Sequence, residues 1–152
     1  MTDGIKYVHT NLVARDWRKL ADFYQRLFGC VPLPPERDLK GDWLDKGTGI
    51  PGAHIRGAHL RLPGYGDAGP TLEIFQYEPV ADAGAKPVNR PGFAHIAFQV
   101  DDVPGMVERV LAEGGEPVGE TVALEVAGAG TVTMAYVTDP EGNIIELQRW
   151  RK

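Results

Sequence analysis

The sequence has little cysteine, no long apolar run and no excess of basic side chains. Its single cysteine, Cys30, excludes an internal disulfide bond and is typical of a protein of the reducing cytoplasm. No stretch reaches the roughly 20 apolar residues of a membrane-spanning helix, and residues 1–6 contain no apolar run of the signal-peptide kind. The formal net charge of −5 argues against nucleic acid or an anionic membrane as a partner. We therefore expect a cytoplasmic protein with neither kind of partner.

The composition that remains is that of an ordinary globular protein. The 152 residues suffice for one compact domain, with 43% hydrophobic and 24% charged residues. The 19 glycines and 12 prolines are dispersed, which indicates many tight turns. Cys30 stands between Gly29, which is expected to end a helix, and Val31, so a packing role is favoured over a nucleophilic one.

The most informative feature is an internal duplication. Residues 93–102 form an apolar, strand-like run that contains a histidine and is closed by acidic residues able to cap a helix. Residues 7–13 have the same form. Three pairs of residues stand 86 positions apart: His9 and His95, Asp16 and Asp102, and Gly29 and Gly115. Register maintained over so many residues indicates two copies of one structural unit.

Each copy is expected to comprise a strand, a helix and three further strands. Asp16 and Asp102 are the expected N-caps of the helices, and apolar residues follow each at the spacing of one buried stripe. The expected strands are residues 5–13, 53–62 and 71–77 in the first copy, and 93–100, 117–126, 131–138 and 143–150 in the second. The first copy contains an insertion of about 13 residues within 34–51, in which residues 41–49 could form a short helix. The sequence thus predicts an α+β domain of two modules, about 5–78 and 92–150, joined by a linker over about 79–91.

Four residues on the first and last strands of the copies form the main candidate site: His9 and Glu73 in the first, and His95 and Glu146 in the second. If the copies pack with pseudo-twofold symmetry, these side chains can converge. Two imidazoles and two carboxylates suit a divalent ion such as Zn, Ni, Co, Mn or Fe(II). The alternative is that each is an isolated core or surface residue. A matched set of four favours a metal, because burying two carboxylates without a cation is costly.

Strand alternation suggests which residues surround this set. The residues expected to share a face with the four candidates, and so to line a substrate pocket, are Asn11, Phe75, Tyr77, Gln99, Gln148 and Trp150. His59 and Arg61 share a face of their own strand and are weaker candidates for the same pocket. His54 is expected at the surface. Trp150 could instead simply close the end of the sheet.

At these residues the chain resembles the vicinal oxygen chelate superfamily, which includes glyoxalase I, methylmalonyl-CoA epimerase, extradiol dioxygenases and bleomycin-binding proteins. The resemblance rests on "HTNLVARDWRKLADFYQRLFG", "LEIFQY", "FAHIAFQVDD" and "VTDPEGNIIELQ" and covers nearly the whole chain. It implies paired βαβββ modules that curl into an open barrel of mixed sheet around one metal ion. It also implies that the four candidates are ligands of a glyoxalase-type centre, and that the protein is a homodimer.

The chain departs from this family where glyoxalases bind glutathione. Bacterial glyoxalase-like sequences tend to carry an arginine, an asparagine and a basic loop residue where this chain has Val13, Tyr77 and Gly128. The resemblance therefore implies that glutathione conjugates are poor substrates, even if the chemistry is kept.

The resemblance also implies a mechanism, in which a carboxylate removes a proton next to a metal-bound carbonyl. Glu146 is the expected base, and Glu73 is a ligand and possible second base. This predicts a metal-dependent lyase, isomerase or epimerase acting on a small molecule. One alternative is a three-ligand Fe(II) dioxygenase, disfavoured because Glu73 would fill a position needed by oxygen and substrate. Another is a non-catalytic drug-binding protein, disfavoured because such members generally lack the full ligand set.

Overall fold

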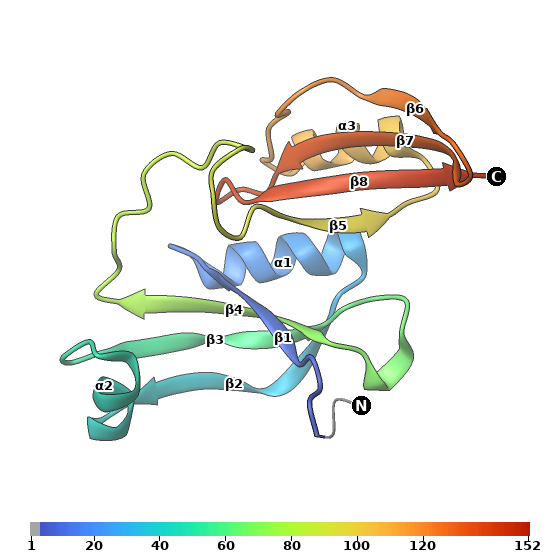
Figure 1. The fold of residues 1–152 in the computed structure, drawn as a ribbon. Helices are drawn as coiled ribbons and strands as arrows, with labels where there is room; N and C mark the ends of the chain where they lie inside the picture. The colour runs from blue at the N-terminus through green and yellow to red at the C-terminus, as the bar shows by residue number, and fades with distance from the viewer. Residues whose placement is uncertain (1–3) are drawn as a thin grey trace. The chain divides into compact units, whose positions relative to one another are not determined.

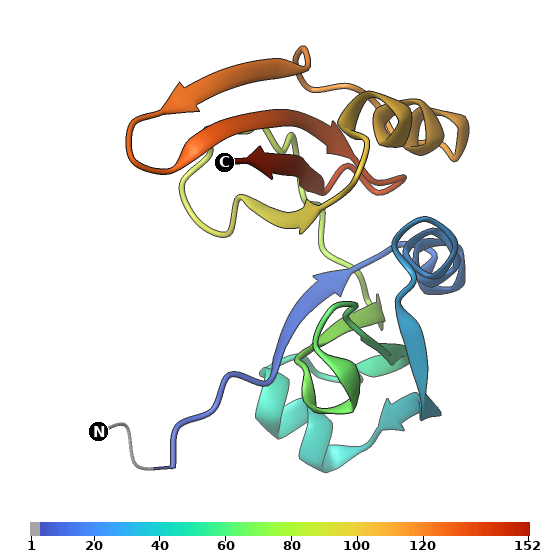
Figure 2. The ribbon, with the colours of Figure 1, turned by 90° about the vertical axis from the view of Figure 1, so that its right-hand side faces the viewer.

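A computed structural model describes residues 4–152, which divide into two compact units, one ending at Asp82 and the other beginning at Ala83. We call them the first and the second module. Each contains a four-stranded mixed sheet covered on one face by a long helix (Figures 1 and 2). The chain is therefore an α+β protein of two tandem modules, as predicted. Among residues 4–152, no helix has the length and apolar character needed to cross a bilayer.

The first module contains seven elements in chain order. They are β1 (His9–Val13), α1 (Trp17–Phe28), β2 (Val31–Lys40), α2 (Asp42–Thr48), β3 (His54–Arg61), the 3-10 turn η1 (Gly66–Ala68) and β4 (Thr71–Glu78). The sheet order is β1-β4-β3-β2, with β1 parallel to β4 and the other pairs antiparallel. This order places the first strand of the module at one edge of the sheet, directly beside the last strand.

Helix α1 forms where its capping residues and apolar stripe predict. The Asp16 side chain accepts a hydrogen bond from the Lys19 amide at 3.1 Å, and Gly29 ends the helix with a left-handed φ of 66°. Alternation along β3 and β4 turns Leu60, Leu72 and Ile74 toward α1, and all three are fully buried. The odd-numbered residues of these strands consequently lie on the opposite face, which we call the site face.

The second module repeats the arrangement without the inserted helix. It contains β5 (His95–Gln99), α3 (Val103–Ala112), β6 (Val122–Val126), β7 (Gly130–Thr138) and β8 (Ile144–Arg151), in the sheet order β5-β8-β7-β6. Asp102 caps α3 by accepting from the Gly105 amide at 3.2 Å. Ile145 and Leu147 of β8 are fully buried on the helix side, so Glu146, which stands between them, faces the other way.

The structure extends the predicted strand pattern at one place and shortens it at others. Val31–Lys40, within and before the inserted segment, forms the edge strand β2, which supplies the strand missing from the predicted first copy. The predicted short helix is present as α2. The opening strand begins only at His9, and the strand predicted from residue 117 begins at Val122, since Pro117 makes only an isolated bridge with Val137.

Helix α2 covers one end of the site face. Its Leu44 packs against Ala53, Ile55 and Phe75, with Leu39, Ile50 and Tyr77 around them. Figure 1 shows the helix at the end of β3 and β2 distant from the N-terminus of β1. Farther along the site face the register places the polar residues Asn11, His59 and Glu73 side by side.

Candidate metal centre

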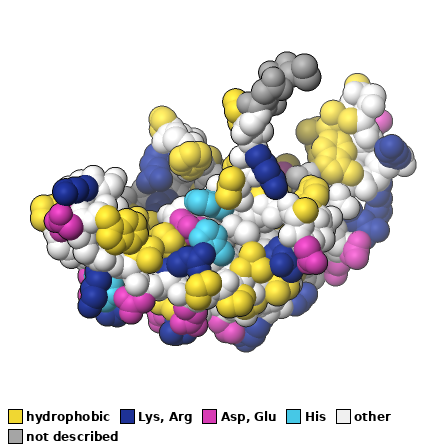
Figure 3. Space-filling model, turned by 90° about the horizontal axis from the view of Figure 1, so that it is seen from below, with side chains coloured by type: hydrophobic (Ala, Val, Ile, Leu, Met, Phe, Trp, Pro, Cys, Tyr) yellow, Lys and Arg dark blue, Asp and Glu magenta, His cyan; other side chains and the backbone are white. Residues whose placement is uncertain are grey.

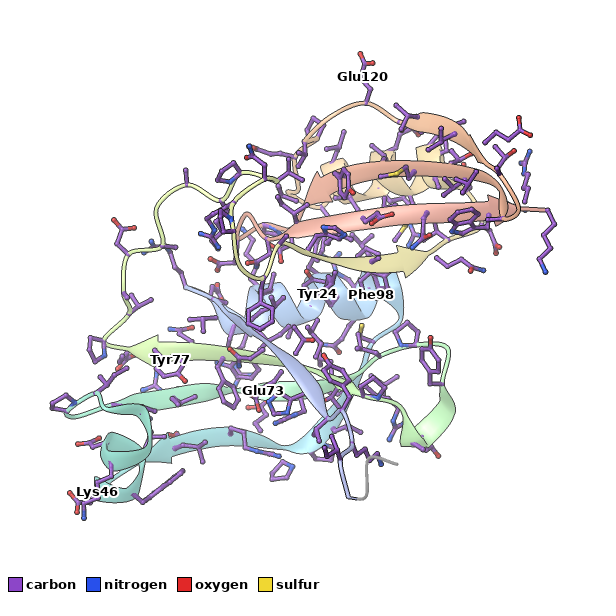
Figure 4. The ribbon with its side chains drawn as sticks, viewed as in Figure 1. Tyr24, Lys46, Glu73, Tyr77, Phe98 and Glu120 are labelled. Carbon is purple, nitrogen blue, oxygen red and sulfur yellow. The ribbon has the colours of Figure 1, made fainter. Side chains whose placement is uncertain are left out.

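The site face of the first module brings together three strands at Glu73. In the sheet register, Glu73 of β4 is paired with His59 on β3 and with Asn11 on β1, and His9 lies two residues before Asn11 on the same face. Glu73 and Tyr77 project from β4 on the site face (Figure 4). Figure 3 looks onto this face and shows the histidine side chains gathered beside an acidic one.

Both carboxylate oxygens of Glu73 are engaged. Oε1 accepts a hydrogen bond from Asn11 Nδ2 at 2.9 Å and lies 3.5 Å from His9 Nε2. Oε2 lies 2.6 Å from His59 Nε2, while His59 Nδ1 lies 3.0 Å from the Thr71 hydroxyl. Glu73 itself is only 9% exposed. The carboxylate is therefore fixed in orientation from three sides.

These residues fit a divalent metal ion by the chemistry of their donors. One ligand atom each from His9, His59 and Glu73 lies within 4.8 Å of the others. Burial, the largest effect, lowers the pKa of His59; Glu73 opposes this shift, while Arg37 and His9 add to it. A lowered pKa favours the neutral imidazole near pH 7, which is the form that binds metal ions.

The second module presents the matching pair. His95 Nε2 lies 3.0 Å from Glu146 Oε2, and Ala97 and Tyr136 are the cross-strand partners of Glu146 on β5 and β7. The Tyr136 ring packs edge-on against the His95 ring with centroids 5.2 Å apart. Burial, and then the charge of Glu146, raises the pKa of the Tyr136 phenol, so Tyr136 keeps its proton.

The two carboxylates occupy equivalent positions in different surroundings. Where Glu73 has Asn11 and His59 as cross-strand partners, Glu146 has Ala97 and Tyr136. Within the described part of the second module, His95 is the one residue at hydrogen-bonding or ion-pair distance from Glu146. Glu146 is consequently less restrained by its own module than Glu73 is.

The structure therefore brings together His9 with Glu73 and His95 with Glu146, one pair in each module. Convergence of both pairs on a single ion stays a prediction. Sequence reasoning gave His59 too little weight, because it has no histidine counterpart in the second copy, and it missed Tyr136. The signal that could have found both is their place directly across the sheet from a candidate glutamate.

The other candidates lie around these pairs or in apolar packing. The Phe75 ring lies edge-on to His59 with centroids 6.2 Å apart, whereas Tyr77 belongs to the apolar cluster under α2. Arg61 pairs with Asp67 at 2.9 Å. The remaining candidates are in the second module: Gln99 is exposed at the end of β5, and Trp150 Nε1 donates to Gln148 Oε1 at 2.6 Å.

His54, which was expected at the surface, is half-buried and lies on the other face of β3 from His59. Its Nε2 is 2.5 Å from Asp38 Oδ1 on β2. Hydrogen bonding to His54, followed by weaker charge effects, lowers the pKa of the Asp38 carboxyl. This pair belongs to the rim of the sheet on the face opposite to Glu73.

Comparison with known proteins agrees with the arrangement. Residues 6–147 match the family model of the glyoxalase/bleomycin resistance protein/dioxygenase superfamily. The chain is 30% identical over 146 residues to a lactoylglutathione lyase of Arabidopsis thaliana, covering 95% of this chain but only 44% of that protein. It is 28% identical over 143 residues to a lactoylglutathione lyase of Neisseria meningitidis, covering 94% of this chain and 89% of that one.

Solved structures share the fold. A glyoxalase family protein from Bacillus cereus superposes with a TM-score of 0.82 at 22% identity, covering 100% of this chain and 99% of that chain. The fosfomycin resistance protein FosX of Listeria monocytogenes, in complex with Mn(II) and sulfate, gives a TM-score of 0.55 at 18% identity, covering 99% and 95% of the two chains.

Proposed function

Because the chain belongs to the glyoxalase/bleomycin resistance protein/dioxygenase superfamily, we propose that it is a metal-dependent lyase or isomerase that removes a proton beside a carbonyl group. The observation that carries this proposal is the histidine–glutamate pair at the same strand positions of both modules. The relatives named lactoylglutathione lyase support the reaction class, and the Mn(II) in the FosX complex supports a divalent ion in this fold.

The proposed ligands are His9, Glu73, His95 and Glu146, which would hold one Zn, Ni, Co, Mn or Fe(II) ion. Such an ion supplies positive charge that stabilises the negative charge developing on a substrate oxygen when a neighbouring C–H bond breaks. The donor set fits these ions, since imidazole and carboxylate are both among their usual ligands.

Glu146 is the residue we assign as the base. It would take the proton from the carbon beside the carbonyl, so that the C–H electron pair forms a C=C bond and the carbonyl π pair moves onto the oxygen. The support for choosing it over Glu73 is the difference in surroundings. Both oxygens of Glu73 are held by Asn11 and His59, whereas Glu146 has one polar partner in its module. Glu73 is accordingly assigned as the fixed ligand.

A second candidate is an Fe(II) dioxygenase. The cluster of His9, His59 and Glu73 within one module favours it, because two histidines and one carboxylate form the usual ligand set of non-haem iron oxygenases. Against it, His59 is occupied by bonds to Glu73 and Thr71, which is how an outer residue orients a metal ligand. A passive small-molecule binder is the third possibility.

The experiment that tests the proposal combines metal analysis with proton exchange. The purified protein should contain one divalent ion per chain, and His9→Ala and His95→Ala should each abolish its retention. His54→Ala is the matched control and should retain the metal. Unchanged occupancy in both site variants would remove the proposed centre.

The reaction class is tested on the metal-loaded protein with a panel of small carbonyl compounds in deuterated water. Exchange of the C–H proton beside the carbonyl, followed by NMR, is expected for at least one compound. Oxygen consumption with a catechol and Fe(II) would instead favour the dioxygenase. Metal binding without exchange or oxygen consumption across the panel would favour the binder.

A further inference from the structure

We propose that Arg37 and Arg61 form an anion-binding subsite on the site face of the first module, and that the substrate carries a carboxylate or phosphate group. This inference rests on the proposed function for the position of the reacting atoms. It concerns the class of molecule that the same site accepts, and the residues involved lie outside the proposed ligand set.

Both arginines lie on the site face, on opposite sides of His59 along the sheet. Arg61 follows His59 by two positions on β3, so both side chains point to the same side, with Cα atoms about 7 Å apart at the usual strand rise. Arg37 of β2 is paired with Gly57, two residues before His59. Figure 3 shows basic side chains bordering the histidines on this face.

The positive charge of these arginines is poorly compensated within the described residues. Arg37 forms no ion pair there, and its guanidinium donates to the Pro35 carbonyl. Arg61 pairs only with Asp67, whose side chain is 94% exposed, and exposed pairs contribute little. The nearby carboxylate of Glu73 is already bonded to Asn11 and His59. Arg37 thus has no carboxylate partner among the described residues, and Arg61 has one exposed partner.

One nitrogen of Arg61 gives a second, independent observation. Its Nε is buried and has no hydrogen-bond partner, and an unpaired buried donor is unfavourable. A bound carboxylate or phosphate would supply acceptors for the guanidinium, which binds such groups through paired hydrogen bonds. The geometry fits a compact molecule with its reacting carbonyl near Glu73 and a second, anionic group a few bonds away.

The test uses three probes that differ only at the distal end. They are 2-oxopentanoate, with an uncharged end; 2-oxoglutarate, with a carboxylate; and 2-oxo-4-phosphonobutanoate, with a phosphonate. Calorimetric titration of the metal-loaded protein should give a Kd lower by about tenfold or more for at least one of the two charged-end probes than for 2-oxopentanoate. The tighter of the two identifies carboxylate or phosphate as the preferred group. Equal affinity for all three in the wild type would overturn the proposal.

The variants assign the preference to the two arginines. Arg61→Gln and Arg37→Gln should each remove most of the difference between the probes. Arg56→Gln is the matched control, because Arg56 lies on the same strand but on the other face, 3.6 Å from Glu78, and should leave the difference intact. If the site variants keep the preference, or Arg56→Gln loses it equally, the subsite is wrong.

Two further measurements distinguish anion binding by these arginines from a purely structural role and from loss of the metal. Asp67→Asn should preserve or increase the preference; a loss as large as that of Arg61→Gln would mean that Arg61 only holds the loop. Direct metal titration accompanies every variant. Failure of the wild type to bind metal defeats the proposed function, and the probes at the metal-free protein then still decide whether the arginines prefer the charged end.

Discussion

The sharpest prediction compares Glu146→Gln with Glu73→Gln. Both substitutions keep the size of the side chain and one potential oxygen ligand, and both remove the negative charge. If Glu146 is the base, Glu146→Gln should slow C–H exchange by about 10² or more at saturating metal, which is about 2.7 kcal/mol of barrier. The contact it loses within its own module is the single pair with His95 at 3.0 Å.

Glu73→Gln should instead affect stability and metal binding more than the rate of C–H exchange. It replaces a carboxylate bonded to both Asn11 and His59, and bonds of this charge-assisted kind contribute about 1.5–3 kcal/mol each. The expected losses are therefore in thermal stability and metal affinity, with a smaller effect on exchange once metal is saturating.

The assay measures deuterium incorporation by NMR at several metal concentrations, together with a thermal melt of each variant. The two kinetic effects can then be separated from loss of metal. The assignment fails if Glu73→Gln slows exchange more than Glu146→Gln at saturating metal. If both variants bind metal and exchange at the wild-type rate, neither carboxylate is the base.

Three further predictions concern other residues. His59→Phe keeps an aromatic ring but removes the bond to Glu73, so metal affinity should fall by about 10–100-fold while exchange at saturating metal is nearly unchanged; His54→Phe is the control, and equal affinities would exclude a supporting role for His59. The hemithioacetal of methylglyoxal and glutathione should be a poor substrate, because Val13, Tyr77 and Gly128 stand where glutathione contacts are expected; a kcat/KM within roughly 10⁴–10⁸ M⁻¹s⁻¹ would contradict this. Burial raises the pKa of Cys30 to about 12, so iodoacetamide at pH 8 should alkylate the native thiol at least about 10³-fold more slowly than the unfolded one, and comparable rates would show that the thiol is accessible.

The sequence sufficed for those parts of the fold that are governed by local patterns. Asp16 and Asp102 cap their helices because a carboxylate at that position bonds an amide of the first turn, whatever lies elsewhere in the protein. The repeated histidines were recognisable because the spacing between the copies is constant. These signals involve residues close together or in identical register.

The strand β2 was missed for a physical reason. It contains Pro32, Pro34 and Pro35, which argue against a strand in most settings. Here the strand is at the edge of the sheet and its register shifts between Leu33 and Arg37, so missing amide donors are tolerated. Whether a strand lies at an edge is a property of the assembled sheet, not of the segment.

The cross-strand neighbours were missed for a similar reason. His59 is bonded to Glu73 because β3 and β4 pair in one particular register, which is set across the loop of residues 62–70. A shift of one residue would turn His59 away. The role of Tyr136 beside Glu146 depends on pairing in the same way.

The unequal neighbours of Glu73 and Glu146 bear on how the two halves of such a centre can evolve. In a dimer of identical single-module chains, every substitution next to one carboxylate is repeated next to the other. Here the two copies are on one chain, and Asn11 and Ala97, or His59 and Tyr136, could be substituted separately. The duplication therefore permits one carboxylate to be held rigidly while its counterpart stays adjustable, a distinction that a strictly symmetric assembly cannot encode.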